Sequence, residues 1–98
     1  MTVKVTVRHN LGQKTALTRI KGRISELLDQ YPDVKNTKVN WVEYVGEFSG
    51  TYKGFSVTGT LRVTESSVTV EADLPFVLRP FKSRIEEAIR EELKELLS

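Results

Sequence analysis

Hydrophobic and polar residues alternate along the middle of the chain, from about residue 36 to residue 74. One parity of this stretch is mostly apolar and reads Phe55, Val57, Gly59, Leu61, Val63, Val68, Val70, Ala72 and Leu74. The other parity is polar and reads Ser56, Thr58, Thr60, Arg62, Thr69, Glu71 and Asp73. Alternation with a period of two predicts an antiparallel sheet with one dry face and one face in water.

The same alternation predicts three further strands. The first strand buries Val3, Val5 and Val7. A polar loop over 33–37 precedes a second strand that begins with Val39 and Trp41, and a turn or bulge follows near Glu43. The third strand places one set of residues on the dry face: Tyr44, Gly46, Phe48, Gly50 and Tyr52. Turns are predicted at Lys53-Gly54 and over 65–67.

Helical spacing of apolar residues predicts two amphipathic helices, over about 12–31 and 80–97. The first stripe is Leu17, Ile20, Ile24, Leu27, Leu28 and Tyr31, and the second is Phe81, Ile85, Ala88, Ile89, Leu93, Leu96 and Leu97. Asn10 suits the N-cap of the first helix, and Pro32 ends it. Gly22 predicts a close approach by the second helix, because a mid-helix glycine costs about 1 kcal/mol. Pro80 suits a first helical turn.

These elements predict one α+β domain over residues 1–98. The order is strand, helix, four strands, helix, which gives a five-stranded antiparallel sheet with both helices on one face. This arrangement is that of helix-grip folds or of one half of a TATA-binding protein, and the likeness concerns the fold alone. A chain of 98 residues is long enough for a single core.

Composition excludes several kinds of site. The chain has no cysteine, which rules out disulfides and thiolate metal sites. The single histidine, His9, offers no metal-ligand spacing. It lies far along the chain from the candidate nucleophiles Ser49, Ser56, Ser66 and Ser67, which are on the wet parity or in turns. Glu71 and Asp73 share a face, but such pairs are usually charges in solvent. We therefore expect no enzyme activity and no metal or cofactor.

Apolar runs are too short for a membrane span, and the alternating N-terminus is unlike a signal peptide. We expect a soluble, cytoplasmic protein.

Basic residues gather near the N-terminus although the net charge is only +2. No acid precedes Glu26, so an anionic surface could be bound by Arg8, His9, Lys14, Arg19, Lys21 and Arg23. The alternative is that these residues bind no partner. They would then form a solvated helix face, with Asn10 as the N-cap and His9 packed at the sheet edge.

Glycines on the dry parity suggest a ligand site. Their missing side chains either let the sheet bend and pack closely, which interiors favour, or leave a cleft for an apolar ligand. The candidate ligand-binding residues are Trp41, Gly46, Phe48, Gly50 and Gly59. Two apolar groups indicate either core or a dimer surface: Phe76, Val77 and Leu78, and Leu93, Leu96 and Leu97. Nucleic-acid binding is disfavoured, because the aromatic residues lie on the dry parity.

Several short stretches, in order, resemble a small bacterial family, the polyhydroxyalkanoic acid system proteins. They are His9-Asn10-Leu11-Gly12, Trp41, Phe48, Gly54, Gly59-Thr60-Leu61-Arg62-Val63, Leu74-Pro75-Phe76, Pro80-Phe81-Lys82 and Arg84-Ile85-Glu86. The resemblance implies a non-catalytic accessory protein linked to storage-polyester granules, and it carries no binding residues with it. An apolar ligand or the granule surface is then the expected partner.

The regular alternation and the Glu-, Lys- and Leu-rich C-terminal helix are also typical of an engineered scaffold. This pattern gives the alternative hypothesis of a scaffold or homodimer without a ligand. Gly22 and the basic start of the first helix oppose it.

Overall fold

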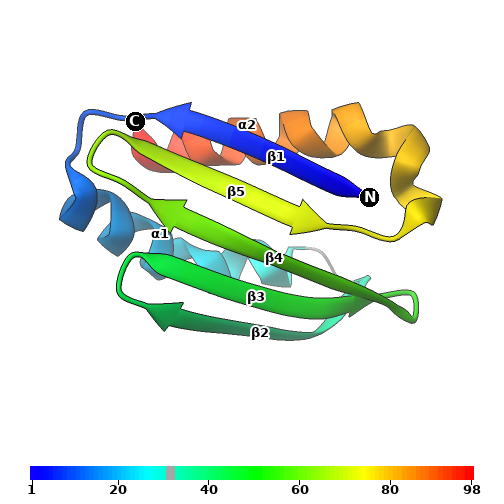
Figure 1. Ribbon diagram of the computed structural model, residues 1–98. Coiled ribbons are helices and arrows are strands. Elements are labelled where there is room, and N and C mark those ends of the chain that lie inside the picture. The colour runs from blue at the N-terminus through cyan, green and yellow to red at the C-terminus, as the bar shows by residue number, and fades with distance from the viewer. Residues whose placement is uncertain (31–32) are drawn as a thin grey trace.

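The computed structural model describes residues 1–30 and 33–98, and it confirms the predicted α+β fold. The strands are β1 (Thr2–Arg8), β2 (Val34–Val42), β3 (Val45–Tyr52), β4 (Phe55–Val63) and β5 (Ser67–Asp73). Helix α1 (Gln13–Asp29) follows β1, and a 3-10 helix, η1 (Phe76–Phe81), leads from β5 into α2 (Lys82–Leu97). The strands form one antiparallel sheet in the order β1-β5-β4-β3-β2 (Figure 1).

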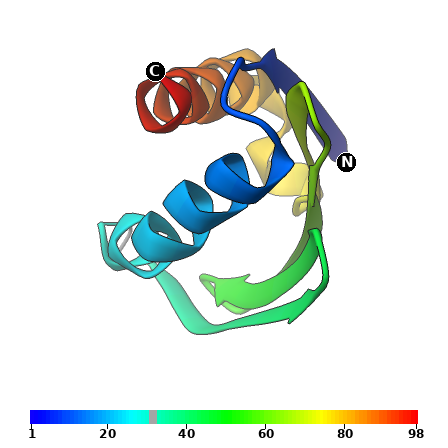
Figure 2. The same cartoon turned by 90° about the vertical axis from the view of Figure 1, so that its left-hand side faces the viewer.

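Both helices lie on one face of the sheet, which curves around them (Figure 2). That face carries the predicted dry parity. Val3, Val5 and Val7 of β1 are buried, as are Leu61 and Val63 of β4, whereas Arg62, which lies between those two, and Thr58 are exposed. The period-two pattern therefore set the register correctly, because a slip of one residue would have turned every apolar side chain to water.

The fully packed core lies at one end of the space between the helices and the sheet. Val7, Val68 and Val63 face one another across β1, β5 and β4 there. Ala16 near the start of α1 and Leu97 at the end of α2 close over them. The antiparallel helices also meet at this end, where the Arg19 guanidinium donates to the backbone oxygens of Leu96 and Ser98. This end of the packing is thus held by elements that are distant in sequence.

Two strand predictions need correction. Strand β2 begins at Val34, so most of the loop predicted over 33–37 is strand, with an irregularity between Lys35 and Lys38. Asn36 takes a left-handed backbone angle there (φ 56°), which asparagine tolerates better than most residues. Phe55, predicted to be buried, is 51% exposed because it lies at the start of β4 beside the turn. The predicted Lys53-Gly54 turn is confirmed, with positive φ at both residues.

Helix boundaries also differ from the prediction. Gly12 accepts the first helical hydrogen bond of α1, from the Ala16 amide, so the predicted N-cap at Asn10 is wrong. Pro80 lies in η1 and not in the first turn of α2. The predicted end of the first helix, at Tyr31 and Pro32, lies outside the described residues, as does the side chain of Leu28.

The predicted helix contact at Gly22 is wrong. A Cβ built at Gly22 would meet nothing within 4 Å, and the residue is exposed. The second helix meets α1 at Arg19, nearly one turn before Gly22.

Candidate ligand cavity between the helices and the sheet

An apolar cavity of about 550 Å³ lies between the helices and the curved sheet. It runs from Ile20 and Leu93, at the packed core, to Leu78 and Phe81 of η1. Phe81, at 47%, and Ala88 line the cavity and are exposed, so the cavity opens to solvent beside η1 and along α2. A volume of this size falls within the range of about 300–1,000 Å³ that is usual for small-molecule sites.

Each layer of the fold contributes to the wall. Helix α1 supplies Ile20, Ile24 and Leu27, and the sheet supplies Val34, Phe48, Tyr52, Val57, Leu61, Val70 and Ala72. The C-terminal part supplies Leu74, Leu78, Phe81, Ile85, Ala88, Ile89, Leu93 and Leu96. Glu92 of α2 is the one charged residue in this lining of described residues. Such a wall suits an aliphatic chain and offers little to a polar molecule.

The sequence indicated only part of this wall. Phe48 is the one candidate ligand residue that lines the cavity. The sequence predicted residues 76–78 to be core or a dimer surface. It did not place Leu78 and Phe81 at a cavity. The signal available was the seven-residue run from Leu74 to Pro80, which is mostly apolar and follows a buried strand.

Aromatic rings cover two of the three glycines on the dry face. The Trp41 ring lies over Gly46, where a Cβ would approach it to 2.9 Å, and the Phe48 ring lies over Gly59 in the same way. Gly50 is bordered by Lys35, Val34 and Thr37, each within 3.4 Å of a Cβ built there. The open space therefore lies beside these residues, toward the helices and η1. A role for Trp41 and these three glycines in ligand binding stays a prediction.

The predicted basic cluster is divided among different partners. Arg19 binds the end of α2, and the Lys21 ammonium lies 5.3 Å from the centre of the Trp41 ring, on the side of β2. Arg23 pairs with Glu26 at 3.2 Å. Arg8 and Lys14 are exposed near the β1–α1 connection. Binding of an anionic surface by these residues stays a prediction.

His9 is buried, with 6% of its surface exposed, and both ring nitrogens have partners. Nδ1 accepts a hydrogen bond from the Leu11 amide at 3.2 Å, and Nε2 lies 3.2 Å from the Thr64 carbonyl. Because Nδ1 accepts and a carbonyl faces Nε2, the neutral tautomer with its proton on Nε2 fits both contacts. His9 thus joins the β1–α1 connection to the turn between β4 and β5.

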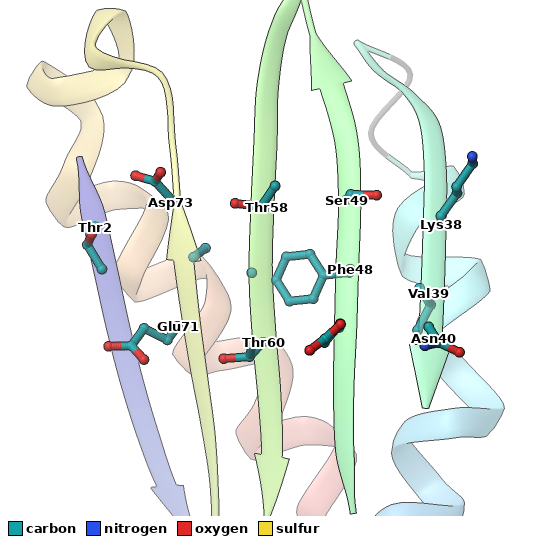
Figure 3. A pocket seen from close by; sticks show the side chains of 13 residues that line it. Thr2, Lys38, Val39, Asn40, Phe48, Ser49, Thr58, Thr60, Glu71 and Asp73 are labelled. Carbon is teal, nitrogen blue, oxygen red and sulfur yellow. The ribbon is translucent and has the colours of Figure 1, made fainter. Parts of the chain in front are cut away.

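The outer face of the sheet carries a second, open hollow of about 900 Å³ (Figure 3). Register places Asp73 beside Thr58 and Glu71 beside Thr60, so the predicted carboxylate pair faces hydroxyl groups. No cluster of three or more metal-ligating side chains occurs within residues 1–30 and 33–98. His9, the one histidine, lies buried between the β1–α1 connection and the turn between β4 and β5. The hollow thus offers hydroxyl and carboxylate groups to a polar molecule.

Comparison with known proteins identifies the family of the chain. The family model described as "Putative polyhydroxyalkanoic acid system protein" matches residues 3–97. The chain belongs to this family. No curated protein and no solved structure shows a significant match. Among the described helices, none has the length and apolar character that a membrane crossing requires.

Proposed function

We propose that this polyhydroxyalkanoic acid system protein is a non-catalytic accessory protein that holds an acyl chain in the cavity between its helices and its sheet. The family supplies the link to the polyester, whose repeating unit is a hydroxyacyl group. The observation that carries the proposal is the cavity itself, about 550 Å³ with a single charged lining residue, Glu92. Enclosing an aliphatic chain in such a wall removes apolar surface from water, by about 25 cal/mol per Å².

The cavity wall favours binding over catalysis. Phe48, Val57, Leu61 and Ile85 offer no proton donor, nucleophile or metal ligand to a bound chain. Glu92 and the Tyr52 hydroxyl are the polar side-chain groups in this lining of described residues. An accessory protein of this kind would bind or carry its ligand unchanged.

The alternative hypotheses receive less support. Leu93, Leu96 and Leu97, considered as a dimer surface, are buried in the core. The free edge of the sheet at β2 carries Lys35 and Lys38 around an irregularity, a usual defence against edge-to-edge pairing. Binding of nucleic acid on the outer face would meet the carboxylates of Glu47, Glu71 and Asp73.

A titration with decanoate, kept below its micelle concentration, tests the proposal by NMR of the labelled protein. We expect saturable shifts at the amides of Leu27, Val57, Phe81 and Ile85, which border the cavity. Ala88→Phe fills the space and should weaken binding at least tenfold. Ser25→Phe places the same ring on an exposed part of α1 and should leave binding unchanged. Equal affinity of the two variants, or no saturable binding by the wild type, would contradict the proposal.

A further inference from the structure

Exposed apolar side chains gather around the mouth of the cavity. Among the described residues, the large apolar side chains that stand most exposed are Phe76 at 71%, Val77 at 56%, Phe55 at 51%, Phe81 at 47% and Val42 at 66%. Four of the five come from η1 or from the residue after the β3–β4 turn. Figure 1 places η1 and this turn at the same end of the molecule and the end of β2 at the other. Val42 is the last residue of β2.

This end of the molecule also carries cations beside its aromatic rings. The Arg79 guanidinium lies 5.3 Å from the centre of the Phe76 ring, and the Lys53 ammonium lies 5.5 Å from that of Tyr52. Lys82 and Arg84 follow in the next turn, and no acidic residue occurs from Leu74 to Ile85. Apolar side chains flanked by cations suit a surface that is both apolar and anionic.

The charge pattern decides between the possible occupants. If a second copy used this surface, the two-fold contact would place Arg79, Lys82 and Arg84 opposite the same cations. The like charges would oppose that contact. Phe76 and Val77 are more than half exposed, so a fluid layer can accommodate their side chains individually.

We propose that η1 and the β3–β4 turn form an anchor that rests on an anionic lipid layer. Phe76, Val77 and Phe81 enter the boundary between headgroups and acyl chains, while Arg79, Lys82 and Arg84 contact the phosphates. The mouth of the cavity then faces the acyl chains. This inference goes beyond the proposed function, because the anchor works through exposed side chains whether or not the cavity holds a ligand.

Co-sedimentation of the 98-residue protein with vesicles tests the anchor. We expect binding to phosphatidylcholine vesicles that contain one quarter phosphatidylglycerol, and binding at least tenfold weaker to phosphatidylcholine alone. Raising the salt concentration from 0.05 to 0.5 M should reduce binding, since exposed charges are then screened. Equal binding to both vesicles, or none to either at low salt, would overturn the proposal.

Variants locate the surface. Phe76→Ser with Val77→Ser should reduce binding at least tenfold, and Arg79→Gln should reduce it about fivefold toward the anionic vesicles. Val42→Ser removes an equally exposed apolar side chain at the opposite end and should have no effect. An equally large loss of vesicle binding in Val42→Ser would contradict the assignment of the binding surface to η1. So would a wild-type dimer in sedimentation velocity that the Phe76 and Val77 changes dissociate, because a second copy would then occupy the surface.

The filled-cavity variant separates the two proposals. Ala88→Phe should keep its affinity for anionic vesicles while it loses decanoate binding. If it lost both, the exposed side chains would not act independently of the cavity, and the anchor as stated would be wrong.

Discussion

The ring of Phe48 lies over Gly59, the residue that it faces across β3 and β4. A Cβ at position 59 would come within 2.6 Å of Phe48 Cε2 and 2.7 Å of the Glu71 backbone oxygen. Trp41 covers its own cross-strand partner, Gly46, in the same manner. Each aromatic ring thus fills the place of a side chain missing from the neighbouring strand, which leaves no void where the sheet bends.

We expect Gly59→Ala to destabilise the protein by about 1–3 kcal/mol, the usual effect of overpacking. The Phe48 ring could rotate away, but the Glu71 carbonyl belongs to the backbone of β5 and cannot move without disturbing the sheet. Urea unfolding followed by the fluorescence of Trp41 measures the change. A loss below about 0.5 kcal/mol would show that the strands separate easily at this point.

Gly22→Ala should change the free energy of unfolding in the opposite direction from Gly59→Ala. Nothing lies within 4 Å of a Cβ at Gly22, and the residue is in the interior of α1 without a positive φ. Alanine should therefore stabilise the protein by about 0.5–1 kcal/mol through helix propensity and a more restricted unfolded chain. The same urea titration compares the two glycines directly. Destabilisation by Gly22→Ala would mean that the helix needs the glycine for a contact absent from this structure.

His9→Phe should destabilise the fold by about 1–3 kcal/mol. The phenyl ring keeps most of the buried volume but leaves the Leu11 amide and the Thr64 carbonyl without their side-chain partner. Its neighbour Asn10 is exposed, so Asn10→Ala serves as a control with an expected change within 0.5 kcal/mol. Equal effects of the two changes would argue that His9 contributes only volume, or that the turn binds water instead.

How far the sequence predicts this structure depends on the range of each interaction. Alternation placed Val3, Leu61 and Val68 on the correct face, because a strand's two faces follow directly from local order. Helix ends were less predictable. Asn10 is a good capping residue, yet α1 begins only after Gly12, because the connection first folds around the buried ring of His9.

The cavity was beyond sequence reasoning because it depends on how far apart elements stand in space. The glycines correctly suggested a bent dry face, but nothing local shows that Phe48 and Trp41 fill the positions above them. Likewise, Phe81 has helical spacing with Ile85 and was expected in the core. The 3-10 geometry of η1 places it at the mouth, 47% exposed.

Arg19 is expected to hold the C-terminal end of α2 in place. Its guanidinium donates to the backbone oxygens of Leu96 and Ser98, carbonyls that have no partner within the helix, and its charge complements the helix dipole. Arg19→Gln should lower the free energy of unfolding by about 0.5–1 kcal/mol. It should also speed amide exchange in the last turn of α2 while leaving β1 and β5 unchanged. Lys14→Gln, an exposed change of the same charge on α1, should do neither. If both variants loosened α2 equally, the effect would come from the net charge, and the contact between Arg19 and the helix end would add nothing.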